Sequence, residues 1–524
     1  MQVFSKDADE VVLLYSPREE VEVGENIKIW DESKKRGVII QIIELDLARI
    51  PGILEDLIRN ESIPSGKIIE HIPKGLKQFV ADIRNMKFAI GKIRKEVSGK
   101  DLSVVPWSGW MPNRGAEVEP VEDSWLLERL GVGNPFPILM GETVYGKATF
   151  SVSGFDLQEG GTTIITGKKG TGKSHAAKMI LMGLIEHGAR CIVFDVNDEY
   201  SGLEQALKDK KADGRIVKLE PGVNLKFLLT YIGLDVFANV LRTQMGAGDP
   251  SIFDLQRTWG RLVKEEVPVT LDSLVKALYP SVNSNEEEVN PDSFASKATA
   301  GALTRRIYGL KRTKLFTDRP DQATTIESEL KKLKKGGALV FNLKGKRADV
   351  RNIVVGTVLT KLENLLEANA KYPPIFIFAE EAHLYIGSTD WDNIITRMRH
   401  LGTYQFYVTN TPTSLPEMLI RQTDNLFLFN LMNDDDYTYI APAAKLDTDT
   451  IKHVAKALPP RTCMAMGLAT KDYPFVIRTA PLNYAAGESR RFFKYDGKTA
   501  EIASFSGADD DVGEKRDDDN EFSL

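Results

Sequence analysis

Residues 167–174 read Gly-Lys-Lys-Gly-Thr-Gly-Lys-Ser, a full match to the phosphate-binding pattern G-x-x-x-x-G-K-[ST]. A β-branched run, 162–166, precedes this loop, and a helical pattern, 174–180, follows it. A strand–loop–helix unit of this kind surrounds anionic phosphates with backbone N–H groups and directs a helix N-terminus at them. A chance match of a glycine-rich turn is disfavoured because both flanking elements are in place. The sequence therefore predicts a site for a nucleoside triphosphate.

The residue types in the loop assign a role to each position. Glycine lets the backbone approach the phosphates without a Cβ clash. We expect Lys173 to reach the β- and γ-phosphates of ATP, and Ser174 to hold Mg²⁺. The predicted nucleotide-binding residues are Gly167, Gly170, Thr171, Gly172, Lys173, Ser174 and His175.

A second group able to do chemistry is the pair Glu380-Glu381, which ends the apolar run 375–379. One carboxylate can order the water shell of Mg²⁺, and the next can polarise an attacking water. We assign Glu380 to the metal and Glu381 to the general base. Two acids at an ordinary helix start are the alternative, which the presence of the phosphate loop disfavours. Lys173 and Glu380 are 207 positions apart, a separation that requires a helical insertion.

Polar residues also follow two other strand-like runs. Asp195 to Tyr200 comes after the run 191–195, where α/β sheets bind ligands, although a solvated loop with a helix cap is equally compatible with Asp195 and Glu199. Asn410 ends the run 405–410, a strand that we expect next to the phosphate-loop strand, where Asn410 senses the γ-phosphate.

Basic residues lie between the paired acids and this last strand. Arg397 and Arg399 are either surface charge or an arginine finger for a neighbouring subunit, a device that stabilises transition-state charge. From the residues alone, surface charge is the favoured reading.

The elements that position these residues indicate an α/β protein with a RecA-like P-loop core. Strand-like runs in the first hundred residues predict a small β-barrel. The predicted domains are a barrel (1–110), a linker (111–139), an ATPase core (140–480) with a helical insertion at about 225–335, and a C-terminal arm with an acidic disordered tail (481–524).

Composition and charge exclude several other classes of protein. The 524 residues are 42% hydrophobic and 27% charged, which is typical of a soluble multidomain protein. No apolar run approaches the roughly 18–20 residues that span a bilayer, so we expect no membrane. Two cysteines do not suggest a disulfide framework, and the cytoplasm is the expected compartment. Residues 507–524 hold eight acids and two bases, so the net charge of −6 lies entirely in the tail.

The order of these parts resembles the HerA–FtsK superfamily of hexameric translocases, in its HerA-like branch, over nearly the whole chain. The leading strands resemble the HAS-barrel of that branch. The ordered motifs that carry the resemblance are Phe194-Asp195 to Glu199-Tyr200, Glu380-Glu381-Ala382-His383, Arg399-His400-Leu401-Gly402, Thr409-Asn410-Thr411-Pro412, Asn425 to Asp436, and Leu458-Pro459-Pro460 to Met466-Gly467.

The sequence departs from the pattern of this family at three positions. Asn410 replaces the usual sensor glutamine, and Glu380 replaces the more common aspartate. Asn430 stands where many relatives carry an arginine, which leaves Arg399, Arg397 and Arg421 as finger candidates.

The resemblance implies an ATP hydrolase that forms a homo-hexamer and translocates or unwinds double-stranded DNA. Rings that look like this usually work with a nuclease or defence effector, for instance of NurA or sirtuin type, in DNA end resection or antiphage defence. The alternative is an ATP-gated hexameric scaffold that activates a bound effector and moves no DNA. Conjugation-type pumping is disfavoured without a membrane segment, and ABC-type ATPases without a Leu-Ser-Gly-Gly-Gln motif.

Overall fold

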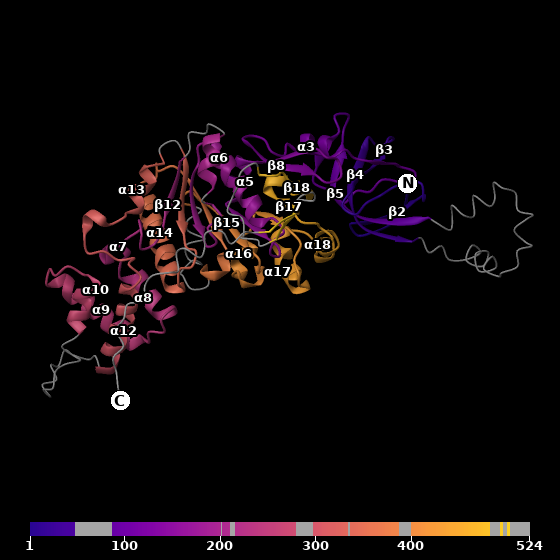
Figure 1. Ribbon diagram of the computed structural model, residues 1–524. Coiled ribbons are helices and arrows are strands. Elements are labelled where there is room, and N and C mark those ends of the chain that lie inside the picture. The colour runs from indigo at the N-terminus through magenta and orange to yellow at the C-terminus, as the bar shows by residue number, and fades with distance from the viewer. Residues whose placement is uncertain are drawn as a thin grey trace, which may run out of the picture.

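A computed structural model describes most of the chain. The described residues are 1–47, 86–200, 202–209, 215–278, 297–333, 336–386, 400–482, 493–495 and 500–502. Arg397, Arg399 and the acidic tail therefore lie outside the described residues. An N-terminal sheet, a central sheet with helices, and a helical region follow one another along the length of the molecule (Figure 1).

The N-terminal region is an antiparallel sheet with strand order β1-β2-β5-β4-β3-β7, in which β6 also pairs with β5. Side chains alternate in β2, where Val11, Leu13 and Tyr15 are buried, so one face of the sheet covers a core. Edge strands β1 and β7 contact each other, although no strand pairing joins them within the described part of the chain. This half-barrel confirms the predicted N-terminal β-structure. The strands are β1 (Gln2–Asp7), β2 (Glu10–Tyr15), β3 (Asn26–Asp31), β4 (Arg36–Leu47), β5 (Lys87–Ser98), β6 (Ser103–Val105) and β7 (Glu117–Pro120).

The central sheet has the order β12-β13-β11-β14-β15-β10-β16-β17-β18-β8-β9. Its first seven strands are parallel, and the remaining pairs are antiparallel. Every residue of β10, β13 and β14 is buried, as expected for parallel strands covered on both faces. The bounds are β8 (Pro137–Thr143), β9 (Thr149–Ser153), β10 (Thr162–Thr166), β11 (Arg190–Asp195), β12 (Arg215–Leu219), β13 (Gly337–Asn342), β14 (Ile375–Glu380), β15 (Thr403–Thr409), β16 (Asn425–Leu428), β17 (Thr462–Gly467) and β18 (Phe475–Thr479).

The position of β15 determines the layout of the site. It lies between β10, which leads into the phosphate loop, and β14, which ends in the paired acids. Thr166 and Thr409 are register partners at the carboxyl ends of β10 and β15. The predicted adjacency of these two strands is confirmed, and all predicted site strands end at one edge of the sheet.

Helices accompany the central sheet and make up most of the described residues between β12 and β13, as predicted for a helical insertion. In Figure 1, α8, α9, α10 and α12 form a group at the end of the molecule opposite the N-terminal sheet. One apolar core runs from this group through α14 to the sheet. The helices are α3 (Asp123–Leu130), α4 (Gly154–Gly160), α5 (Lys173–Glu186), α6 (Leu203–Asp209), α7 (Leu229–Ile232), α8 (Leu234–Thr243), α9 (Asp249–Lys264), α10 (Leu271–Leu278), α12 (Lys297–Lys311), α13 (Ile326–Lys331), α14 (Ala348–Ala368), α16 (Glu417–Arg421), α17 (Asp434–Ala444) and α18 (Thr448–Ala455).

The N-terminal sheet is joined to the central region by buried polar contacts. Tyr473 donates to Asn26 Oδ1 at 2.6 Å, and Asn26 Nδ2 donates to Asp123 Oδ1 at 2.9 Å. Gln41 Nε2 donates to Pro474 O at 2.8 Å. Because buried polar groups are costly without partners, these contacts fix the two regions to each other.

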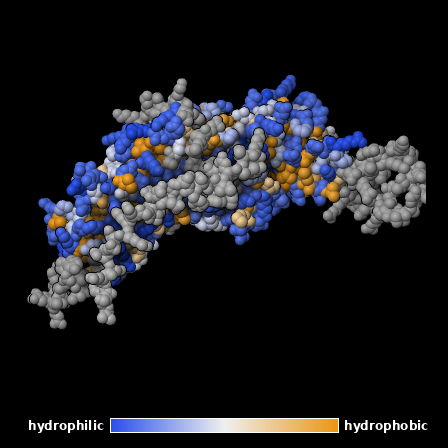
Figure 2. Space-filling model, in the orientation of Figure 1, coloured by the Kyte–Doolittle hydropathy of each residue, from blue (hydrophilic) through white to orange (hydrophobic). Residues whose placement is uncertain are grey.

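The surface shown in Figure 2 is mainly hydrophilic, with apolar residues gathered near the N-terminal sheet. No helix in the described ranges is both long and apolar enough to cross a membrane. A hairpin of β19 (Phe493–Tyr495) and β20 (Ala500–Ile502) is the last described element.

Candidate nucleotide-binding site

The loop after β10 has the backbone geometry of an anion cradle. Helix α5 begins at Lys173, and Gly172 before it has φ 115°. Gly167 and Gly170 have φ 156° and 82°. A Cβ added to Gly167 would lie 2.5 Å from Phe429 Cβ, so a larger residue cannot occupy that position without displacing its neighbour. The glycines predicted from the pattern therefore provide both the positive φ values and the space that this loop requires.

Lys173 is a buried cation at the mouth of the loop. Its Nζ donates to Lys168 O at 3.2 Å, and Thr171 Oγ1 donates to the same carbonyl at 2.7 Å. Burial lowers the pKa of Lys173, while the carboxylates of Glu381 and Glu380 oppose that shift. A cation between the loop and two acids is positioned to meet the terminal phosphates of a nucleotide.

The first residue of the acid pair faces the hydroxyl of the loop. Ser174 Oγ donates to Glu380 Oε2 at 3.5 Å, and Glu380 is buried at the end of β14. Burial raises the pKa of Glu380 to about 8, although a hydrogen bond from Tyr200 opposes the rise. A dry carboxylate of this kind is stabilised as an anion when a cation lies beside it.

The donor set fits magnesium. A hydroxyl and a carboxylate oxygen are hard ligands, and Mg²⁺ usually takes one or two protein oxygens and completes its shell with phosphates and waters. Within the described ranges, no group of three or more His, Cys, Asp or Glu side chains is arranged to hold a metal ion. Ser174 and Glu380 are therefore suited to a metal that arrives with a nucleotide.

Glu381 has a strained backbone and an available carboxylate. Its φ and ψ are both 47°, in the left-handed region that non-glycine residues seldom adopt. Glu381 Oε2 is buried without a hydrogen-bond partner among the described residues and lies 3.5 Å from His383 Nδ1. His383 Nδ1 is also 3.1 Å from Thr409 Oγ1, and burial lowers the pKa of His383. A carboxylate oxygen without a donor is free to accept a proton from water.

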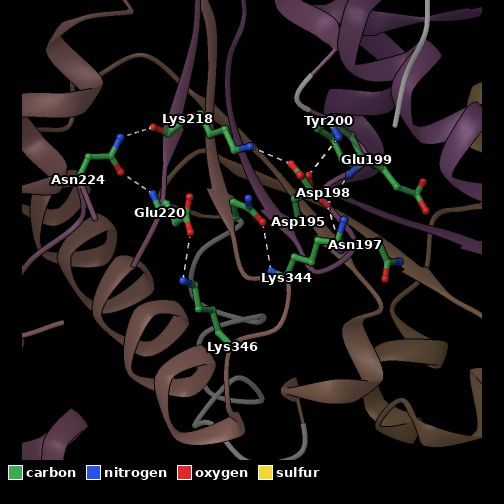
Figure 3. Close-up of polar contacts among 11 residues, drawn as sticks. Asp195, Asn197, Asp198, Glu199, Tyr200, Lys218, Glu220, Asn224, Lys344 and Lys346 are labelled. Atoms are coloured by element: carbon green, nitrogen blue, oxygen red, sulfur yellow. Dashed lines mark hydrogen bonds and ion pairs between the residues drawn. The ribbon is translucent and has the colours of Figure 1, made fainter. Parts of the chain in front are cut away.

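The turn after β11 is held by hydrogen bonds to the carboxylate of Asp195 (Figure 3). The carboxylate of Asp195 accepts the backbone N–H groups of Asn197, Glu199 and Tyr200 at 3.2, 3.0 and 3.0 Å. Asp195 therefore caps this turn, whereas Glu199 pairs with Lys178 at 3.2 Å. The buried carboxylate of Asp195 thus acts as a cap, and a ligand-binding role for the two acids stays a prediction.

Tyr200 is the contact that sequence reasoning missed. Its hydroxyl donates to Glu380 Oε1 from the end of the turn. The sequence placed Tyr200 in a motif but offered no role for it, because the pairing bridges 180 residues. The only available signal was the position of an aromatic residue with a polar tip after a buried strand.

The remaining predicted residues lie around the loop at different depths. Asn410 follows β15 and is half-buried, and its Oδ1 accepts the hydroxyl of Thr411 at 2.8 Å. The carbonyl of Asn430 accepts Lys168 N at 2.8 Å, while its side chain donates to Lys456 O at 2.7 Å. Asn430 thus supports the loop through its backbone.

Two further residues support the loop from the C-terminal side. His175 Nε2 donates to Ala480 O at 2.6 Å, and burial lowers the pKa of His175. Arg461 N donates to Thr171 O at 2.7 Å, and the Arg461 side chain is exposed. Arg461 was not among the predicted site residues, since nothing in its local sequence indicates contact with the loop. Arg421, the described finger candidate, is exposed on α16 and pairs with Glu417 at 2.5 Å.

Comparison with known proteins places this geometry in context. Residues 163–362 match the family model described as "Helicase HerA, central domain". No curated protein matches the chain. The VirB4 structure of Thermoanaerobacter pseudethanolicus is 15% identical, with a TM-score of 0.50, and the match covers 67% of this chain and 98% of that one. The bacterial conjugative coupling protein TrwBdeltaN70 is 14% identical, with a TM-score of 0.47 and coverage of 71% and 94%. The likeness to VirB4 concerns the fold, and the predicted α/β P-loop ATPase class is confirmed.

Proposed function

We propose that this HerA-like chain is an ATP-driven motor that moves or unwinds double-stranded DNA, because residues 163–362 match the model of the HerA helicase central domain. The observation that carries the proposal is the meeting of Lys173, Ser174 and the Glu380-Glu381 pair at one edge of the sheet. This combination supports the binding of ATP with Mg²⁺ and the hydrolysis of its terminal phosphate.

Each residue has a distinct part in the proposed reaction. The loop and Lys173 bind and orient the phosphates, and Ser174 with Glu380 would hold Mg²⁺, which would neutralise charge on the phosphates. Glu381 accepts the proton of the attacking water. Asn410, at the end of the strand beside the loop, contacts the γ-phosphate or its water.

We further propose a ring of six identical subunits, with each nucleotide bound at a boundary between neighbours. An arginine from the adjacent subunit then completes the site, as an arginine finger does in other P-loop enzymes. Arg399 is our first candidate and Arg397 the second. Arg421 follows, because its side chain is 71% exposed and can exchange Glu417 for a phosphate.

The proposed ring acts in the cytoplasm with a partner nuclease or defence effector, of NurA type, sirtuin type or another kind. DNA end resection and antiphage defence both require a motor that delivers duplex DNA to a second enzyme. The neighbouring gene, if it encodes such an enzyme, would identify the pathway.

The test compares ATPase activity with and without linear duplex DNA and measures displacement of a protein roadblock from that duplex. We expect DNA to stimulate the wild-type ATPase and the roadblock to be displaced, while Lys173→Ala shows neither. ATP hydrolysis that ignores DNA and displaces nothing would contradict the motor and favour the ATP-gated scaffold. Absence of hydrolysis under both conditions would contradict both readings.

A further inference from the structure

We propose that Tyr200 is a positioning residue of the magnesium site: its hydroxyl holds one oxygen of Glu380 and thereby presents the other to Ser174. The inference rests on the ATPase activity proposed above, and assigns to that site a residue that touches neither nucleotide nor metal. It also explains why a tyrosine follows the turn after β11.

The two oxygens of the Glu380 carboxylate have different hydrogen-bond partners. Oε1 accepts the Tyr200 hydroxyl, and Oε2 accepts the Ser174 hydroxyl at 3.5 Å. Tyr200 and Ser174 are its only hydrogen-bond partners among the described residues. Because Ser174 is expected to turn toward the metal, Tyr200 is the contact that can hold the carboxylate plane before and after nucleotide arrives.

Tyr200 is itself held firmly. The side chain is fully buried, so its ring cannot swing away from Glu380. Its backbone N–H is bound by Asp195, as Figure 3 shows. Lys178 Nζ lies 5.4 Å from the centre of its ring and forms an ion pair with Glu199. The ring, the backbone and the turn therefore have fixed places relative to β14.

Glu380 itself is buried. Glu380 is 3% exposed, so water cannot readily replace a lost donor. Without the Tyr200 hydroxyl, Oε1 would be an unsatisfied buried acceptor, and the carboxylate would rotate toward any remaining donor. The oxygen intended for the metal would then leave its place beside Ser174.

The chain offers a matched control. Tyr385 is also fully buried, and its hydroxyl donates to the backbone carbonyl of the same residue, Glu380 O, at 2.9 Å. Tyr200→Phe and Tyr385→Phe each remove one buried hydroxyl bonded to Glu380. Only the first removes a bond to the carboxylate, so a general loss of packing would affect both variants alike.

The experiment measures binding of a fluorescent ADP analogue to the full-length chain over a range of Mg²⁺ concentrations, and without Mg²⁺. Mg²⁺ should increase the affinity for the ADP analogue, and half of this increase is reached at a particular Mg²⁺ concentration. We expect Tyr200→Phe to raise that concentration about 10-fold, because residues that support metal ligands have effects of this size. Affinity without Mg²⁺ should equal that of the wild type. Tyr385→Phe should match the wild type in both measurements.

A second variant, Asp195→Asn, weakens the turn while leaving the hydroxyl in place, and we expect a smaller shift in the same direction. Tyr200→Phe with a wild-type Mg²⁺ dependence, or an equal shift in Tyr385→Phe, would overturn the positioning role. Either result would leave the proposed ATPase intact if the wild type hydrolyses ATP. A wild type that binds no nucleotide would instead overturn the proposed function, and the inference with it.

Discussion

Replacing Glu381 by glutamine tests the assignment of the general base most directly. The substitution keeps the size of the side chain and removes its charge and its ability to take a proton. Glu381 Oε2 accepts no hydrogen bond among the described residues, so the change breaks no hydrogen bond of that oxygen and affects its 3.5 Å contact with His383 Nδ1. The backbone at φ 47° is equally accessible to both residues. We therefore expect Glu381→Gln to fold and assemble as the wild type does.

The expected loss of hydrolysis rate follows from the role of general base assigned to the Glu381 carboxylate. Loss of a positioned general base slows the chemical step about 10²–10⁴-fold. This corresponds to about 2.7–5.4 kcal/mol of activation free energy. Binding should behave differently, because Glu381 is the largest carboxylate influence on Lys173, the residue that we propose meets the terminal phosphates. Removing a negative charge there leaves ATP affinity equal or tighter.

The assay is single-turnover ATP hydrolysis together with equilibrium binding of a fluorescent ATP analogue. Lys173→Ala provides the contrasting pattern, since it should lose tight binding as well as turnover. Glu142→Gln, an exposed carboxylate on β8, controls for the loss of one negative charge. Hydrolysis by Glu381→Gln within about tenfold of the wild-type rate would refute the assignment, since a base contributes at least about 10²-fold.

Three further outcomes are expected. Asn26→Ala and Tyr473→Phe should each lower the free energy of unfolding, by about 1–3 kcal/mol for each buried partner left unsatisfied. In a double-mutant cycle the two losses should not add, and additive losses would contradict a direct contact. Burial raises the pKa of both Cys191 and Cys463, so neither thiol should react with a disulfide reagent until the protein unfolds, and rapid labelling of the native chain would contradict their burial. Rings mixed from subunits lacking the P-loop lysine and subunits lacking Arg399 should regain ATPase activity, because some interfaces then contain no lesion. No recovery in rings with proven subunit exchange would show that the finger lies elsewhere.

Much of the fold and part of the candidate site follow from local patterns in the chain. Glycine spacing fixed the shape of the phosphate loop, because positive φ values and close approach leave little alternative at Gly167 and Gly172. Apolar runs ending in acids located Glu380 and Glu381 at a sheet edge, because fully buried parallel strands have that pattern. These predictions needed only short-range information.

The missed contacts all depend on residues brought together by tertiary structure. The hydroxyl of Tyr200 meets Glu380 across 180 residues, and the backbone of Arg461 meets Thr171 from the far end of the domain. No local pattern specifies such pairs. Asp195 was ambiguous for a similar reason, because a carboxylate that caps a turn and one that binds a ligand follow a strand in the same way. The predicted finger residues Arg397 and Arg399 remain predictions.

The contact between Asn26 and Tyr473 has a consequence for the chain while the ribosome is still making it. These two residues are 447 positions apart, and Gln41 and its partner Pro474 are 433 positions apart. At roughly 5–20 residues per second, Asn26 emerges roughly 20–90 s before Tyr473, which lies in the segment just before β18. During that interval Asn26, 3% exposed in the finished fold, has water as its partner. The side of the nascent half-barrel that carries Asn26 and Gln41 therefore stays without its protein partners until almost the whole chain has been made.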